Sequence, residues 1–178
     1  MKKLILACLT MVSVLVVGSG ASAADSDELF FQSVEGKWSG PGEIVAGKYK
    51  GTKFVCKLEG STPGFVAGMK LDGSCNVGIF SQPMKASVVR SGGTYQGEFN
   101  DGSEGTGLDV VSGKVTGNRV VLGLNRKDLN GVMLAHVDED DSMNVTISVK
   151  VDSELVPVID MNLKRVDANG ASRNIAKN

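Results

Sequence analysis

The stretch "SMNVTISVKVD", residues 142–152, alternates apolar and polar side chains with a period of two. Successive side chains of a β-strand point to opposite faces, so this alternation predicts a strand with one buried and one solvated face. The same pattern recurs about nine times along the chain, for example in "TKFVCKLEG" (52–60) and "GNRVVLGLN" (117–125). The chain is therefore expected to be mostly strand.

Short segments of turn-forming residues separate these strands and predict tight hairpins. They are Asp72-Gly73, Ser91-Gly92-Gly93, Asn100-Asp101-Gly102, Gly117-Asn118 and Asn130-Gly131. A long antiparallel meander has two exposed edges, and closing the sheet removes them. We predict an all-β fold, a single antiparallel up-and-down β-barrel of about eight to ten strands, with an open sandwich as the alternative. A short helix over 28–34, capped by residues 25–27, is expected before the first strand.

The chain begins with Met1-Lys2-Lys3, an apolar run from Leu4 to Val17, and the small residues Ala21-Ser22-Ala23. This order is typical of a secretory signal peptide, predicted over residues 1–23. The apolar run is shorter than the roughly 20 residues of a membrane-spanning helix. Cys8 as a lipid attachment site is the less favoured alternative. Residues 24–166 are predicted to form the barrel domain, and 167–178 a disordered polar tail. The predicted location is periplasmic or secreted.

After removal of residues 1–23, Cys56 and Cys75 are the remaining cysteines. An even cysteine count in an oxidising compartment predicts a disulfide between them. A redox or metal-binding pair is the alternative, but the sequence has no C-x-x-C spacing. Cleavage would leave a net charge of −3, and the sequence has no basic patch, so a nucleic-acid partner is not expected.

Catalytic and metal-binding patterns are sparse. His136 is the only histidine, and it lies in a strand pattern without a G-x-S-x-G motif. The acidic run "DEDD", residues 138–141, is interpreted as a solvated hairpin tip, with a weak calcium site as the alternative. We therefore expect no enzyme activity, no cofactor and no metal site.

Gly36-Lys37-Trp38 lies at the expected first strand, and Arg165 at the end of the last one. In these features the chain resembles the calycin superfamily, which contains the lipocalins. The resemblance implies that Trp38 plugs one end of the barrel and that Arg165 packs across its ring. A ligand-stacking role for Trp38 is the alternative.

Two further resemblances concern function. The pattern "GKW…CKLEG…MKLDGSC" is similar to periplasmic inhibitors of bacterial metalloproteases, which are eight-stranded barrels. The segments "GKWSGPGEI" and "KRV", with Gly113, Val115, Gly117 and Arg119, resemble a group of small exported proteins of alphaproteobacteria. The first resemblance implies protease inhibition, whereas the second implies location and fold but no activity.

Four methionines, Met69, Met84, Met143 and Met161, are predicted to point inward. Flexible thioethers form an adaptable apolar ligand lining, or they fill a core that has no cavity. Both interpretations stay open from sequence. The predicted function is an exported, non-enzymatic barrel that binds a small apolar molecule or an envelope protein, with a periplasmic protease inhibitor as the alternative. The nine aromatic residues left after residue 23 are few for the girdles of an outer-membrane barrel, so membrane contact is expected to be peripheral at most.

Overall fold

The computed structural model describes residues 23–64, 66–100, 108–139 and 141–166. The predicted signal peptide and polar tail lie outside these residues, except for Ala23. The described chain contains one helix and ten strands. These are α1 (Ala23–Val34), β1 (Gly36–Ile44), β2 (Lys53–Ser61), β3 (Gly68–Val77), β4 (Phe80–Ser91), β5 (Thr94–Asn100), β6 (Leu108–Thr116), β7 (Arg119–Arg126), β8 (Leu129–Val137), β9 (Ser142–Val151) and β10 (Glu154–Val166).

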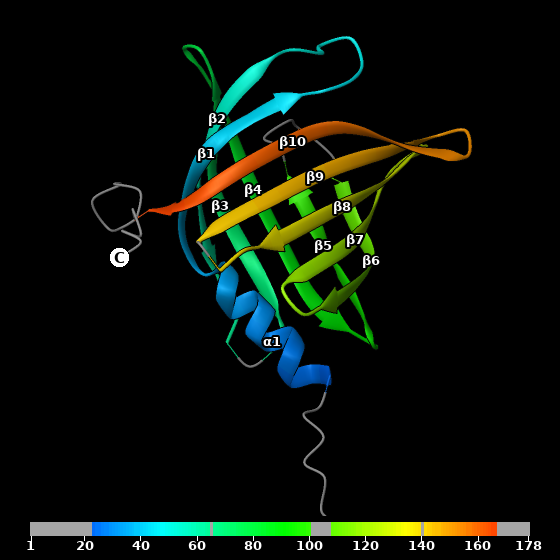
Figure 1. The fold of residues 1–178 in the computed structure, drawn as a ribbon. Helices are drawn as coiled ribbons and strands as arrows, with labels where there is room; N and C mark the ends of the chain where they lie inside the picture. Colours follow the sequence, from blue (N-terminus) through cyan, green and yellow to red (C-terminus); the bar gives the residue numbers. More distant parts are fainter. Residues whose placement is uncertain (1–22, 65, 101–107, 140, 167–178) are drawn as a thin grey trace, which may run out of the picture.

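The strands form one closed barrel in which each strand pairs antiparallel with its neighbour in sequence. β1 also pairs with β10, for example Trp38 with Arg165, so the sheet has no free edge. Figure 1 shows the barrel with α1 lying at one end. The predicted up-and-down barrel after a short helix is therefore confirmed, with ten strands. No helix among the described residues is long and apolar enough to cross a membrane.

Two of the predicted turns are wrong. Asp72-Gly73 lies inside β3 and Asn130-Gly131 inside β8. A Cβ atom on Gly73 would lie 2.1 Å from the carbonyl oxygen of Lys57 on the neighbouring strand. Gly73 is thus required for the close approach of β2 and β3. In the sequence, a glycine with this role looks the same as a glycine in a turn. The predicted turns at Gly92-Gly93 and Gly117-Asn118 do connect strands, whereas the one after Asn100 falls outside the described residues.

Helix α1 closes one end of the barrel with its apolar side. Phe30, Phe31 and Val34 are buried in the core cluster that fills this end. The helix already includes Ala23, so the predicted cap at residues 25–27 is wrong. Asp27 is instead a buried helical residue, and its carboxylate interacts with the barrel wall.

The carboxylate of Asp27 joins α1 to strands β4 and β5. The Tyr95 hydroxyl donates a 2.6 Å hydrogen bond to Asp27 Oδ2, and Arg90 Nη1 lies 3.4 Å from the same oxygen. Burial, followed by this hydrogen bond, raises the pKa of Tyr95 above its ordinary value of about 10. Local sequence patterns do not predict this cluster, because Asp27 is 63 residues from Arg90 and 68 from Tyr95 in the chain.

We expect Tyr95→Phe to lower the free energy of unfolding by about 1–3 kcal/mol, because Asp27 loses a buried hydrogen-bond donor. The native protein should also lose stability above about pH 10, where Tyr95 ionises in the unfolded chain but keeps its proton in the folded one. Tyr95→Phe lacks the hydroxyl group whose ionisation causes this loss of stability. Urea unfolding of both proteins between about pH 8 and pH 11 measures the difference between their free energies of unfolding. This stability gap should become smaller as the pH rises. A gap that stays constant would contradict the assignment.

Candidate functional site

The closed end of the barrel is built around Trp38, which is 1% exposed. Its indole Nε1–H donates a 2.8 Å hydrogen bond to the carbonyl oxygen of Val34 in the last turn of α1. The guanidinium carbon of Arg165 lies 4.3 Å from the centre of the indole, within the range of a cation–π contact. The structure thus places Trp38 between the helix and the last strand.

Arg165 also binds the end of α1. Its Nη2 donates to the carbonyl oxygen of Ser33 at 2.7 Å, and its Nη1 donates to that of Glu35. The last carbonyls of a helix have no partner within the helix and form the negative end of its dipole, so a guanidinium there is favourable. Gly36 follows with φ of +99°, and a Cβ atom on it would lie 3.1 Å from Arg165 Nη1. The G-x-W pattern therefore allows a sharp turn directly beneath the arginine.

The acidic run 138–141 is not simply a solvated hairpin tip. Asp141 Oδ1 accepts a 2.6 Å hydrogen bond from Arg165 Nε, and Asp138 Oδ1 lies 2.7 Å from His136 Nε2. Asp140 lies outside the described residues. Across the described ranges, no group of three or more His, Cys, Asp or Glu residues could hold a metal ion. The carboxylates of Asp138 and Asp141 thus serve contacts within the barrel wall and its closed end.

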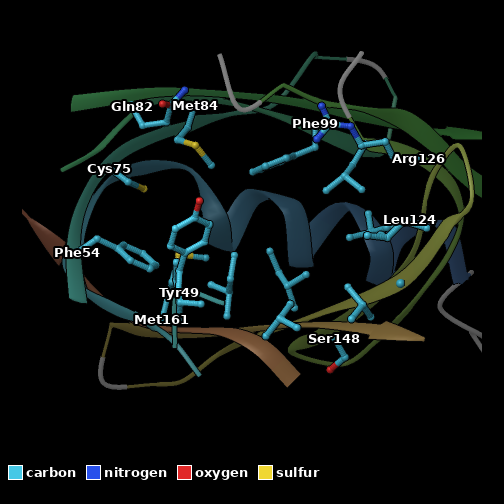
Figure 2. A pocket seen from close by; sticks show the side chains of 18 of the residues that line it. Tyr49, Phe54, Cys75, Gln82, Met84, Phe99, Leu124, Arg126, Ser148 and Met161 are labelled. Atoms are coloured by element: carbon cyan, nitrogen blue, oxygen red, sulfur yellow. The ribbon is translucent and has the colours of Figure 1, made fainter. Parts of the chain in front are cut away.

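The opposite end of the barrel opens into a cavity of about 660 Å³. Figure 2 shows the side chains around this space, with the blue ribbon of α1 lying behind them. Most lining side chains are apolar, and the polar ones are Tyr49, Gln82, Arg126 and Ser148. The remaining lining residues are Ile44, Phe54, Cys75, Val77, Met84, Phe99, Leu108, Leu124, Leu129, Gly131, Ile147, Val149, Val158, Ile159 and Met161.

A narrower space of about 70 Å³ continues from this cavity toward α1. The two spaces share lining residues on several strands, namely Cys75, Met84, Phe99, Ile147 and Met161. Phe30, Phe31 and Val34 of α1 line the narrower space. The interior is consequently filled near the helix and open toward the far end.

The predicted methionine set divides between these regions. Met84 and Met161 line the large cavity, whereas Met69 and Met143 line only the narrow space next to the helix. Trp38 lines neither space, so it is not placed to stack on a molecule in the large cavity. Of the predicted site residues, the structure therefore brings two methionines and one half-cystine together at the cavity.

The predicted disulfide between Cys56 and Cys75 is confirmed. It joins directly paired positions on β2 and β3. Cys56 is fully buried, and its sulfur lies 3.9 Å from the Met161 sulfur, while Cys75 lines the cavity. The bond therefore fixes part of the cavity wall.

Several cavity residues were not predicted. Phe54 and Phe99 follow the inward alternation of their strands, which is a usable sequence signal. Tyr49 lies in the β1–β2 connection, where alternation gives no direction. Arg126 ends β7 and continues the inward series of that strand after Leu122 and Leu124, but the alternation does not show that it reaches the opening. Only the folded connections show that these two side chains border the same opening (Figure 2).

No protein-family model and no curated protein matches the chain in sequence. Among solved structures, the chain is similar to the crystal structure of Rv2717c from M. tuberculosis, with a TM-score of 0.56 and 13% sequence identity. The match covers 79% of this chain and 98% of that one. At this identity the likeness supports the barrel fold alone. The calycin and alphaproteobacterial resemblances, and export, stay predictions.

Proposed function

We propose that this barrel is a non-enzymatic binding protein that holds a small apolar molecule in the large cavity. The supporting observation is the predominantly apolar lining of a space that is open to the outside. Its volume of about 660 Å³ falls within the range of roughly 300–1,000 Å³ that is typical of small-molecule sites. Water in contact with such a lining is unfavourable, and an apolar ligand would displace it.

The distribution of polar groups indicates how the ligand is oriented. The deep part of the interior is lined by apolar side chains such as Met84, Ile147 and Met161. The polar side chains of Tyr49 and Arg126 lie at the opening, in or beside the strand connections. A molecule with an apolar body and one polar group would place the body inward and the polar group at the opening. A few polar groups that fix orientation are typical of apolar binding sites.

The lining also favours binding over catalysis. None of the described lining residues is Asp, Glu, His or Lys, and the lining half-cystine is in a disulfide. Such side chains supply most general acids and bases, and Tyr49 is the one other lining residue of a type that serves this role. The disulfide is in keeping with an exported protein, since such bonds persist in oxidising compartments. No contact among the described residues favours the alternative of a protease inhibitor.

Native mass spectrometry of the protein purified from its natural host tests for a retained ligand. We expect additional mass that disappears on denaturation. For a defined probe, 1-anilinonaphthalene-8-sulfonate should bind with increased fluorescence, and an apolar ligand should displace it. The absence of both retained mass and saturable dye binding would refute the proposal.

Met84→Trp is expected to weaken dye binding at least tenfold, about 1.4 kcal/mol, because the larger side chain occupies the cavity. The matched control is Val111→Trp, an equally large replacement at an exposed position of β6 outside the cavity lining. Fluorescence titration should give an unchanged dissociation constant for the control. Equal weakening in both variants, or in neither, would place the dye site elsewhere.

A further inference from the structure

The opening of the cavity is bordered by exposed apolar side chains. They lie within or beside the connections β1–β2, β3–β4, β7–β8 and β9–β10, all at the end opposite α1. We call this set the mouth rim: Tyr49, Val77, Ile79, Phe80, Leu129, Val151 and Leu155. The β5–β6 connection is outside the described residues and is not part of the set.

The apex of the mouth rim is the β3–β4 turn. Ile79 is 94% exposed and Phe80 75% exposed, and the preceding Gly78 has φ of +57° within this tight turn. Tyr49, Val77 and Leu129 of the rim also line the cavity. The apolar surface therefore continues from the tips of the connections into the interior.

Basic side chains accompany these apolar tips. Within two residues of the described rim connections, Lys and Arg outnumber Asp and Glu, although the whole chain has a formal net charge of −1. The basic residues are Lys48, Lys50, Lys53, Arg126, Lys127 and Lys150, and the acidic ones are Glu43, Asp128, Asp152 and Glu154. This excess lies on the β1–β2 connection, where Lys48, Lys50 and Lys53 outnumber Glu43 beside the exposed Tyr49. The sequence in and beside the β5–β6 connection is acidic, with Asp101, Glu104 and Asp109.

We propose that the mouth rim docks the barrel on an anionic phospholipid surface through the neighbouring β1–β2 and β3–β4 connections, with the cavity opening toward the lipid. Apolar side chains that enter the headgroup region, together with lysines near lipid phosphates, are the usual basis of peripheral membrane binding. The rim consists of separate tips around an opening. A fluid lipid surface accommodates such tips individually, whereas protein interfaces are built around a close-packed, shape-complementary core. This inference goes beyond the proposed function and does not depend on the identity of the ligand.

Co-sedimentation with vesicles tests the proposal. The full protein, freed of residues 1–23, should bind vesicles of phosphatidylcholine and phosphatidylglycerol at least tenfold more strongly than vesicles of phosphatidylcholine alone. Binding should weaken as salt is raised, because the lysine contribution is screened. Equal binding to both vesicle types would overturn the electrostatic part, and no binding to either would overturn the proposal.

The double variant Ile79→Glu, Phe80→Glu is expected to reduce binding to the anionic vesicles at least tenfold. The double variant Val111→Glu, Val121→Glu is the matched control, since both are exposed apolar residues on the outer wall, at β6 and β7. The control should bind like the unmodified protein. Equal loss in both would indicate that added negative charge, and not the rim, determines binding, which overturns the proposal.

A second measurement keeps the test independent of these charge changes. Phe80→Trp should show a blue shift of fluorescence on anionic vesicles, whereas Val111→Trp should not, and the buried Trp38 provides a constant background. Analytical ultracentrifugation without lipid tests the alternative that two copies of the chain form a dimer through their mouth rims. A dimer abolished by the double glutamate variant, together with no blue shift, would assign the rim to a second copy of the chain.

Discussion

Trp38→Ala is expected to lower the free energy of unfolding by about 3–5 kcal/mol. The substitution removes the largest fully buried side chain from the closed end of the barrel. It also removes the donor to the carbonyl oxygen of Val34 and the ring on which the Arg165 guanidinium lies. Denaturant unfolding followed by circular dichroism measures the change.

Trp38→Phe is the matched variant, because it keeps an aromatic ring but lacks the indole N–H. We expect its loss of stability to be smaller than that of Trp38→Ala, since most of the plug remains. Neither variant should change dye binding directly, because Trp38 does not line the large cavity. If Trp38→Ala abolished dye binding while stability was unchanged, Trp38 would be a ligand contact and the plug interpretation would be wrong.

Reduction of the Cys56–Cys75 disulfide is expected to destabilise the folded protein by about 3 kcal/mol. The bond closes a short loop, with a sequence separation of 19 residues, and so restricts the unfolded chain. A thermal melt with and without excess reductant should show a lower melting temperature in the reduced sample. The effect follows from the chain-entropy description of disulfides.

The control is the double variant Cys56→Ala, Cys75→Ala. Its melting temperature should be low and insensitive to reductant. An unchanged melting temperature of the unmodified protein in reductant, with free thiols verified chemically, would contradict a stabilising role of the bond. Because Cys75 lines the cavity, dye affinity should be measured in the same reduced sample.

The closed end and the open end of the barrel have complementary roles. Phe30, Phe31 and Val34 fill one half of the interior, and Arg165 holds the end of α1 through the carbonyls of Ser33 and Glu35. The cavity lies at the other end, where the mouth rim borders the entrance, and Figure 1 shows α1 at the end opposite the rim connections.

Much of the fold could be predicted because it depends on local rules. Alternation in segments such as 142–152 indicates strands. The position of Trp38 next to Arg165, by contrast, was implied by the resemblance to the calycin superfamily and not by a local rule. The pairing of Cys56 with Cys75 followed from their number and the expected compartment. The turns at Asp72-Gly73 and Asn130-Gly131 were predicted wrongly, because a glycine that permits close strand contact has the same local signature as a turn glycine.

By itself, the sequence determined the strand periodicity and the chemical types of the inward residues, and it favoured a closed barrel and a Cys56–Cys75 disulfide over their alternatives. The tertiary structure decided which half of that interior is empty. Inward residues alternate in the same way at both ends of each strand, so the pattern does not distinguish a filled half from a hollow one. That distinction depends on where α1 inserts, and Asp27, Tyr95 and Arg165 fix its position through contacts between residues far apart in the chain.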